Sequence, residues 1–341
     1  MLLFAPMARA VDAVGTIGEL RALDPALATG PVSVAGYRTA GDGGGGTFHW
    51  DAAETHADDG GLFIPSNLTP TGRWIRSLGD VLTPQMFGAV ADGVTDDTLA
   101  IQATLDALGS VAVDTIRFES GTYILGTTRP FSYAFENGKF ILLDLGRTTA
   151  LTGRSIRLIG NNARLLSTVS PLQAPIIYIE ASFQSLDVEG LTFEKSSTPV
   201  KDVEEGRSDG MFFTSYDHRS IDRIKIVDCV FINCHRSFTA GFRLGTATRG
   251  KISQFIVERC QFLYPYGANV ISGSAAYSGG QMTYGGAWID TMIYRECLFD
   301  GASNGPLDVI TCPGKRIKDG GHFGGPLRLV FEHNVTRHFS V

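Results

Sequence analysis

Residues 87–102 read Phe87-Gly88-Ala89-Val90-Ala91-Asp92-Gly93-Val94-Thr95-Asp96-Asp97-Thr98-Leu99-Ala100-Ile101-Gln102. Turn-forming glycines lead into paired aspartates, and apolar residues then follow at helical spacing, at Leu99, Ile101, Leu105 and Leu108. A carboxylate at Asp96 or Asp97 can accept hydrogen bonds from the free N–H groups of a helix start, where negative charge also suits the helix dipole. The stretch therefore predicts a turn and a short helix near residues 96–108, with the aspartates in a structural role.

This turn and helix resemble the N-terminal signature of the pectate-lyase superfamily. That superfamily consists of right-handed parallel β-helix proteins and includes secreted polysaccharide lyases, glycoside hydrolases and phage tailspikes. The resemblance implies an all-β fold in which residues 86–341 form a right-handed parallel β-helix, a solenoid whose open N-terminal end is plugged by the helix. It also implies that Asp96 and Asp97 are cap residues rather than catalytic acids.

The composition suits a solenoid and excludes some partners. The chain has 341 residues, of which 43% are hydrophobic and 19% charged, enough for one large core with an N-terminal appendage. A formal net charge of −6 argues against nucleic acid as a partner, because phosphate binding needs a basic face. An acidic polysaccharide stays open as a partner, since a cleft can be locally basic. No apolar run reaches the length of a membrane span.

The first ten residues resemble the end of an export signal. Ala8-Arg9-Ala10 has the A-x-A form of a cleavage site, and apolar residues precede it. The basic start and most of the apolar stretch of such a signal are missing. We interpret residues 1–10 as a truncated remnant, which predicts a secreted or periplasmic protein; an ordinary N-terminus is the alternative.

Residues 11–85 predict a small Gly-rich β region. Val32–Tyr37 alternates like a strand, and the run Gly41-Asp42-Gly43-Gly44-Gly45-Gly46 follows it. This run lacks the GK[ST] ending and the following helix of a phosphate-binding loop, so it predicts a flexible turn between two strands. Together with Asp58-Asp59-Gly60-Gly61 and Gly72-Arg73-Trp74, it resembles the region that precedes the β-helix in bacterial and tailspike members of the superfamily.

The chain after Gly109 reads as a stack of short strands. Four segments superpose, with a looser fifth: Val188–Phe193, Ile226–Phe231, Val257–Phe262, Tyr294–Phe299 and Phe331–Thr336. The spacing between the Leu191, Cys229, Cys260 and Cys297 positions is 31 to 38 residues. Repetition of this kind is typical of a solenoid, in which each turn buries its face on its neighbours. We expect Cys229, Cys260 and Cys297 to stack inside as buried thiols rather than as a disulfide or a zinc site.

A polar residue recurs in the strand that follows each stacked segment. These residues are Asp209, Arg243, Asn269 and Asp308. Like positions in parallel strands stack about 4.8 Å apart, so we expect the four to form a row over a groove. The turn before the Arg243 strand adds His235 and Arg236, and an earlier loop adds His218. The resemblance implies that chemistry occurs on the outside of this one sheet.

Two reactions on an acidic polysaccharide would use such a row. A lyase neutralises a uronate carboxylate, which suits Arg243, and moves the C5 proton, which suits His235 because imidazole titrates near neutral pH. Asp209 and Asp308 would hold Ca²⁺ or orient these groups, and Asn269, Arg236 and His218 would bind substrate. A hydrolase needs two nearby carboxyl groups, but Asp209 and Asp308 would lie about 14 Å apart across two turns. The residues therefore favour β-elimination. No metal-ligand motif is recognised.

Three classes of function remain open from the sequence. The first is an exported enzyme that cleaves a glycan, by elimination before hydrolysis. The second is a tailspike or adhesin that binds a surface glycan, located on the virion if it is a tailspike, and the third is a purely structural β-helix. The chain is expected to be a monomer or a homotrimer. It stops at Ser340-Val341 inside another turn, without a trimerisation region, which favours a bacterial protein or a fragment over a complete tailspike.

Overall fold

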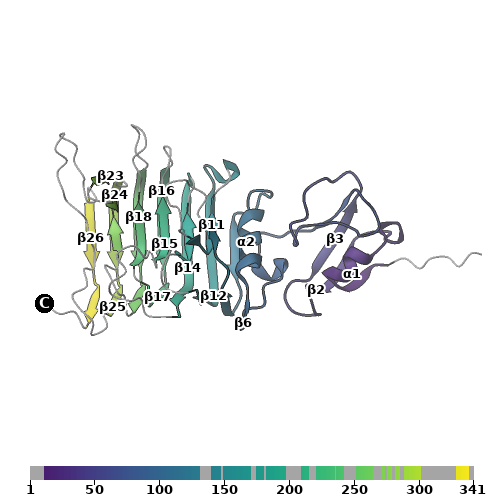
Figure 1. Ribbon diagram of the computed structural model, residues 1–341, viewed down its shortest axis with the longest axis horizontal. Helices are drawn as coiled ribbons and strands as arrows, with labels where there is room; N and C mark the ends of the chain where they lie inside the picture. The colour runs from purple at the N-terminus through teal and green to yellow at the C-terminus, as the bar shows by residue number, and fades with distance from the viewer. Residues whose placement is uncertain are drawn as a thin grey trace, which may run out of the picture. The chain divides into compact units, whose positions relative to one another are not determined.

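The computed structural model of the chain divides into two compact units, with the boundary between Val90 and Ala91 (Figure 1). It describes residues 11–130, 140–146, 149–169, 174–179, 182–196, 209–214, 220–234, 236–241, 251–263, 270–272, 275–278, 281–284, 288–300 and 328–337. The export remnant predicted at residues 1–10 lies outside them.

The first unit is built on a small, mostly antiparallel sheet. Its strand order is β1 (Ala13–Thr16), β2 (Val32–Gly36), β3 (Gly46–Asp51), β5 (Arg73–Arg76) and β4 (Phe63–Ile64). Only the β1–β2 pair is parallel. Helix α1 (Ile17–Ala22) buries Ile17 and Leu20 in one cluster with Phe48 and Trp74 of the sheet. Two 3-10 turns complete the unit, η1 (Pro25–Leu27) and η2 (Pro84–Phe87).

The Gly-rich run between β2 and β3 is a turn, as predicted, but its backbone is tied down. The carboxylate of Asp42 accepts hydrogen bonds from the backbone N–H groups of Tyr37, Arg38, Thr39 and Gly44, at 2.7 to 3.0 Å. Arg76, only 4% exposed, donates to the carbonyl oxygens of Gly44, Gly45 and Gly61. Burial lowers the pKa of the Arg76 guanidinium to about 10, so the side chain is still charged at neutral pH. A Cβ on Gly44 would lie 2.3 Å from the carbonyl oxygen of Gln85, which explains the glycine there.

The motif at residues 87–102 crosses the boundary between the units. Phe87 and Ala89 are buried in the first unit, where the Phe87 ring fills the space that a Cβ on Gly61 would occupy. Gly88 has a left-handed backbone (φ 92°), and its carbonyl oxygen accepts a hydrogen bond from Arg38. Ala91 begins the second unit, so one short motif joins two separately packed bodies.

Helix α2 spans Thr98–Ala107, shorter than the predicted 96–108, and lies at the end of the stack where the chain enters it (Figure 1). Asp97 occupies the N-cap position without a side-chain cap hydrogen bond; it is buried, and its carboxylate accepts the N–H of Ala91 at 3.0 Å. Asp96 is the aspartate that accepts the N–H of Thr98, at 3.0 Å. Leu99 is one of the four apolar residues noted at helical spacing, but it does not join the buried face of the helix. Leu99 is 61% exposed, because the helix buries the face that carries Ile101 and Leu105.

The second unit is a right-handed parallel β-helix, as predicted. Most of its strands form one large folded sheet with two arms. The first arm contains β7 (Thr115–Phe118), the first parts of β12 (Ser155–Ser167) and β14 (Ser185–Lys195), then β16 (Ser220–Val227), β19 (Lys251–Glu258), β24 (Trp288–Arg295) and β26 (Arg328–Glu332). The second arm contains β6 (Asp92–Asp96), β8 (Gly121–Leu125), the later parts of β12 and β14, β17 (Val230–Ile232), β20 (Gln261–Leu263), β25 (Leu298–Asp300) and β27 (Val335–Arg337).

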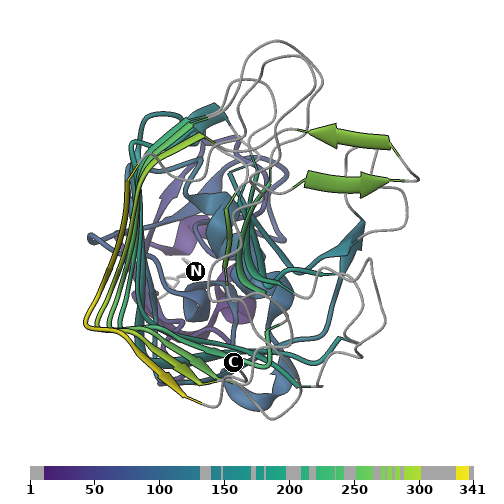
Figure 2. The same cartoon turned by 90° about the vertical axis from the view of Figure 1, so that its left-hand side faces the viewer.

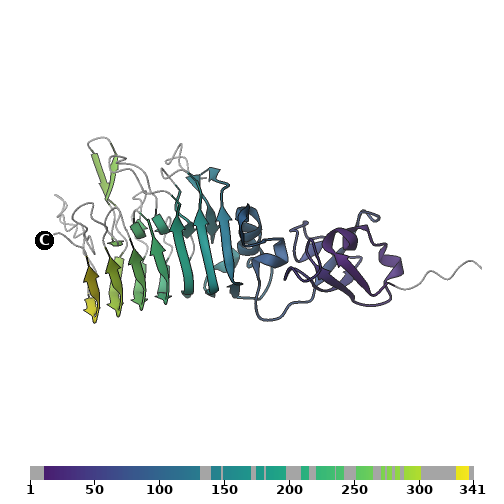
Figure 3. The ribbon, with the colours of Figure 1, turned by 90° about the horizontal axis from the view of Figure 1, so that it is seen from below.

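In the described residues a separate parallel sheet closes five successive turns of the solenoid, and we call it the short-strand sheet. It runs in the order β11 (Leu143–Leu145), β13 (Ile177–Ile179), β15 (Asp209–Thr214), β18 (Arg236–Gly241) and β21 (Val270–Ser272). Viewed along the stack, the strands of successive turns superpose (Figure 2), and from below they form regular layers (Figure 3). Smaller elements are η3 (Thr149–Leu151) and two hairpins, β9 (Arg129–Pro130) with β10 (Phe140–Ile141) and β22 (Ala275–Ser278) with β23 (Gln281–Tyr284).

The corner between the two arms has one conformation in each described turn from β12 to β26. Its residues have left-handed backbones with φ between 51° and 68°: Asn162, Gly190, Asp228, Arg259, Glu296 and His333. The next residue in three of these turns is Cys229, Cys260 or Cys297, and all three are free thiols at most 1% exposed. Each thiol lies 3.6 to 3.7 Å from a carbonyl oxygen of the preceding turn. The interior column of thiols is therefore confirmed, and burial raises the pKa of Cys260.

The interior beside the thiol column is filled by aromatic rings. Phe193, Phe231, Phe262 and Phe299 occupy one register position, with successive ring centroids 4.8 to 5.4 Å apart and nearly parallel. This register confirms the superposition of the segments predicted from the sequence. Cys234 is a further buried free thiol, and Cys312 lies outside the described residues.

Candidate functional site

Two of the seven predicted site residues belong to strands of the short-strand sheet. Asp209 is the first residue of β15 and Arg236 the first of β18, and the two are register partners on neighbouring parallel strands. The other five lie outside the described residues: His218, His235, Arg243, Asn269 and Asp308. The structure thus brings together one acidic and one basic position of the predicted set, at the level of the backbone.

The register of this sheet corrects the predicted row. Asp209 lies opposite Arg236, and Thr214 lies opposite Gly241, so Arg243 comes two residues after the end of β18 and is not the partner of Asp209. The reason is the buried pair Met211 and Phe238, which occupies one register position and aligns the two strands. A one-residue shift would move these apolar side chains out of the core, so their burial sets the alignment.

The first two strands of the short-strand sheet carry polar residues that the sequence prediction missed. Asp144 on β11 and Tyr178 on β13 are register partners, 4% and 2% exposed. Helix α2 covers this end, because the Gln102 side-chain amide makes hydrogen bonds of 2.8 and 2.9 Å with the backbone of Asp144. A carboxylate and a phenol side by side could serve acid–base chemistry, but a polymer cannot reach them while they are buried.

A signal for these two residues was present in the sequence. Asp144 interrupts the apolar run Ile141–Leu145, and Tyr178 interrupts Ile176–Ile179. A carboxylate inside such a run is rarely exposed, and burial of a carboxylate requires polar partners. A polar residue at the centre of a short apolar strand therefore marks a covered position on this sheet.

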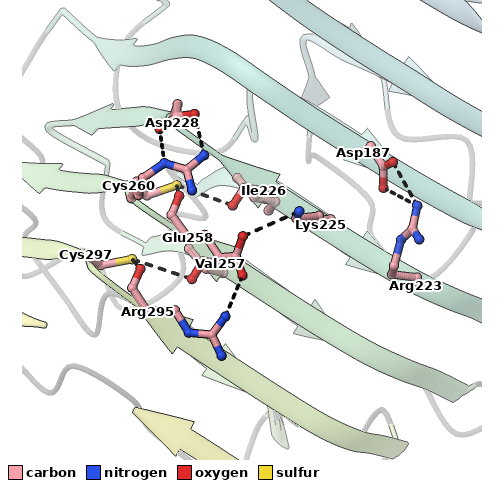
Figure 4. Close-up of polar contacts among 11 residues, drawn as sticks. Asp187, Arg223, Lys225, Ile226, Asp228, Val257, Glu258, Cys260, Arg295 and Cys297 are labelled. Carbon is pink, nitrogen blue, oxygen red and sulfur yellow. Dashed lines mark hydrogen bonds and ion pairs between the residues drawn. The ribbon is translucent and has the colours of Figure 1, made fainter. Parts of the chain in front are cut away.

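The first arm presents a charged outer surface in which most of the charges are paired between turns (Figure 4). Arg223 donates to both carboxylate oxygens of Asp187, at 3.1 and 2.9 Å. Glu258 lies 3.5 Å from the ammonium of Lys225 and 3.2 Å from the guanidinium of Arg295. These contacts cross from one turn to the next, so they hold the register of the stack and neutralise one another.

The corner carries one further ion pair between turns. Arg259 makes two hydrogen bonds to Asp228, at 2.7 and 2.8 Å. Hydrogen bonding to Arg259 holds the pKa of Asp228 below its ordinary value and raises the pKa of Arg259. A surface paired in this way offers little uncompensated positive charge to an anionic sugar.

The described part of the chain contains no group of three or more His, Cys, Asp or Glu side chains arranged to hold a metal ion. The side chains of Asp209 and Asp308, predicted to hold Ca²⁺, lie outside that part, so the calcium site stays a prediction. None of the helices described is long and apolar enough to cross a membrane.

Comparison with known proteins links the first unit to phage tails. A family model described as the phage tail protein small four-stranded β-sheet domain matches residues 13–79, which span the sheet of the first unit. A search of curated protein sequences finds no match. The matched stretch is a minor part of the chain, so it concerns the first unit alone.

Solved structures of bacterial and phage proteins are similar to this chain at low sequence identity. Pantoea stewartii WceF, a glycan biofilm modifying enzyme with a bacteriophage tailspike-like parallel β-helix fold, is 16% identical with a TM-score of 0.49, over 94% of this chain and 50% of that one. Tailspike protein 2 of the Escherichia coli O157:H7 bacteriophage CAB120 is 15% identical with a TM-score of 0.46, over 95% of this chain and 40% of that one. This chain thus spans half or less of the length of either protein.

Proposed function

We propose that this chain is a phage tail protein of the virion whose β-helix binds and cleaves a cell-surface glycan. The observation that carries the proposal is the phage tail match over residues 13–79, in a chain whose second unit is a parallel β-helix. The first unit would attach to the tail, and the solenoid would present a long surface of stacked strands to a polymer. A regular polysaccharide suits such a surface, because both repeat along one direction.

The placement of the glycan on the short-strand sheet is supported by what covers the other surfaces. The first arm pairs most of its charges between turns, and α2 covers the start of the short-strand sheet at Asp144. Among the later strands of this sheet, β15 and β18 carry Asp209 and Arg236 at one register position. We propose that the substrate lies along these strands.

For the reaction we propose β-elimination on a uronate, in keeping with the resemblance to the pectate-lyase superfamily. Arg243 neutralises the carboxylate, which makes the C5 proton more acidic, and His235 accepts that proton. The C4–O bond then breaks, its electron pair leaves with the oxygen, and a C4=C5 double bond forms. The imidazolium or water returns a proton to the leaving oxygen. Asp209 and Asp308 orient these groups or hold Ca²⁺, and Asn269, Arg236 and His218 bind the chain of sugars.

The proposal is tested by incubating the full chain with purified pectin, alginate and bacterial capsular polysaccharides. Binding is measured by calorimetry, new reducing ends by a colour assay, and unsaturated uronate by ultraviolet absorbance. A lyase produces both signals, a hydrolase produces reducing ends alone, and an adhesin binds without either. We expect both signals with one substrate; their absence with a glycan that binds would replace the enzyme with an adhesin, and no binding to any glycan would refute the proposal.

The site is tested on the substrate found in that screen. Arg243→Ala and His235→Ala should each lower kcat/KM at least about tenfold, since each removes a charge or a proton acceptor from the transition state. Arg259→Ala is the matched control, because Arg259 pairs with Asp228 at the opposite corner and should leave turnover unchanged. Equal turnover in the wild type and both site variants would place the site elsewhere.

A further inference from the structure

The interior thiol column has one side-chain geometry that repeats from turn to turn. Cys229, Cys260 and Cys297 each follow a corner residue with the same left-handed backbone. Each Sγ lies 3.3 Å from the carbonyl oxygen two residues earlier and 3.6 to 3.7 Å from a carbonyl oxygen of the preceding turn, as Figure 4 shows for the last two. The three thiols therefore share one rotamer. Leu191 and Asn334 occupy the equivalent positions in the turns before and after.

The spacing of the sulfur atoms follows from this repetition. The carbonyl oxygen of Cys229 accepts the N–H of Gln261, and that of Cys260 accepts the N–H of Leu298, both at 2.9 Å. The cysteine backbones are thus part of the strand ladder, in which neighbouring strands lie about 4.8 Å apart. Because identical side chains on such a ladder repeat at the same distance, successive Sγ atoms are about 4.8 Å apart.

This spacing suits a cation that takes two thiolates in line. A metal–thiolate bond is about 2.3 Å long, so a cation midway between two sulfurs needs them about 4.6 Å apart. Soft cations with a filled d shell prefer thiolate ligands, and the mercuric ion takes two of them in a straight line. A structural zinc ion requires four converging ligands, whereas the described residues bring together no group of even three.

The surroundings of the column favour a soft cation over a hard one. The three thiols are at most 1% exposed, and the stacked rings of Phe231, Phe262 and Phe299 belong to the same buried interior. A charged complex is costly in such a place, because no water solvates it. A divalent cation bound by two thiolates is neutral, so burial does not oppose it in the same way.

We propose that two successive thiols of this column bind one soft cation in linear two-coordinate geometry, with the mercuric ion as the probe. Two S–H bonds break and two metal–sulfur bonds form. Each sulfur donates an electron pair to the cation, and two protons pass to solvent without any oxidation. Cys260 and Cys297 are the favoured pair, because hydrogen bonding with Cys260 lowers the pKa of Cys297, which eases formation of its thiolate. The site is independent of the glycan and of its cleavage.

The test uses the full chain with Cys234→Ser and Cys312→Ser, so that only the thiols of the column remain. The folded chain is incubated with mercuric chloride until uptake is complete, because a buried site fills only as the corner opens. It is then dialysed against a small monothiol. Mercury per chain is measured by mass spectrometry and its ligands by X-ray absorption. We expect one ion per chain, with two sulfur neighbours at about 2.3 Å.

The middle thiol distinguishes a paired site from three independent thiols. Cys260→Ser leaves two sulfurs about 9.6 Å apart, too far for one ion to bridge, so retained mercury should fall at least about tenfold. Cys229→Ser and Cys297→Ser are the matched controls. Each leaves one adjacent pair and should still retain one ion. Cys260→Ala repeats the test with an apolar side chain, and circular dichroism shows that each variant is folded.

Three results would overturn the inference. The first is a folded chain that retains no mercury against the monothiol. The second is equal retention in Cys260→Ser and in the two controls, because the thiols would then bind singly. The third is a coordination shell that contains nitrogen or oxygen, which would place the ion outside the column.

Discussion

The two units keep their backbones in place in different ways. In the first unit, two side chains serve many backbone groups: Arg76 donates to four carbonyl oxygens, those of Gly44, Gly45, Gly61 and Met86, and Asp42 accepts from four N–H groups. In the repeated turns of the second unit, each thiol of the interior column contacts one carbonyl oxygen of the preceding turn, and the same contact recurs from turn to turn. The stability of these turns is therefore spread over many similar positions, whereas the Gly-rich turn of the first unit depends on a few residues.

The difference follows from the backbones that have to be held. The Gly-rich turn of the first unit has few side chains of its own and depends on groups that reach in from elsewhere. A solenoid repeats the same strand pairing in every turn, so each turn is held mainly by its neighbours. Single substitutions should accordingly have large effects at the Gly-rich turn of the first unit and small, local ones in the repeated turns of the solenoid.

The largest effect is expected for Arg76→Met. Four carbonyl oxygens would lose a charged donor, and the first unit should lose about 3 kcal/mol or more of stability. Hydrogen exchange by mass spectrometry reads the two units separately and should show faster exchange in the first unit only. Arg73→Met is the control, since this half-exposed side chain reaches the carbonyl oxygen of His56 and should change stability by less than about 1 kcal/mol. Equal losses of stability in Arg76→Met and Arg73→Met would show that the first unit does not depend on a few residues, which is the contrast drawn with the solenoid.

Asp97→Ala should cause the next largest loss of unfolding free energy, about 2 kcal/mol, because the buried Ala91 N–H loses a charged acceptor. Asp96→Ala should cost about 1 kcal/mol through the loss of the helix cap. Denaturant unfolding measures both values, and turnover per folded molecule should be unchanged in both variants. A loss of turnover at unchanged stability would show that Asp97 is a catalytic acid, contrary to its structural role here.

Acid should weaken the first unit through Asp42. Burial raises the pKa of Asp42, but the N–H groups of the turn outweigh it and hold the pKa below its ordinary value of 3.8. A carboxyl group with a depressed folded pKa contributes stability above its unfolded pKa, and that stability is lost as the pH falls through the folded pKa. The difference in unfolding free energy between the wild type and Asp42→Asn should therefore shrink as the pH falls below about 4. A constant difference would mean that Asp42 does not titrate with unfolding.

The smallest effect is expected at the corner of the solenoid. Glu296 has a left-handed backbone (φ 56°), and Glu296→Gly should raise stability by up to about 1 kcal/mol. Arg259→Gly relieves the same strain at φ 51° but loses the ion pair with Asp228, so its net effect should be close to zero. Thermal unfolding of the two variants gives the difference. A large loss of stability in either variant would contradict this expectation, because it would mean that one corner residue stabilises more of the solenoid than its own turn.

Much of the solenoid was predictable because an apolar residue recurs at each equivalent interior position in successive turns. The superposition of Val188, Ile226, Val257, Tyr294 and Phe331 follows from the sequence repeat, and the strand registers match it. The thiol column follows from the same alignment, and the motif at residues 87–102 indicated the fold class and the helix. These features depend on which side chains face inward, and apolar periodicity records that directly.

The candidate site was less predictable, because it depends on the lengths of the connections between strands. Asp209 pairs with Arg236 rather than Arg243 because the burial of Met211 and Phe238 aligns β15 with β18. The start of helix α2 was also not predictable in detail. Asp96 rather than Asp97 accepts the hydrogen bond from the N–H of Thr98, and Leu99 faces outward. The sequence alone determined which positions repeat and face the core. The tertiary structure decided which residues outside the core become neighbours. Outward side chains and turns of variable length follow no period in the sequence, so their alignment cannot be derived from it.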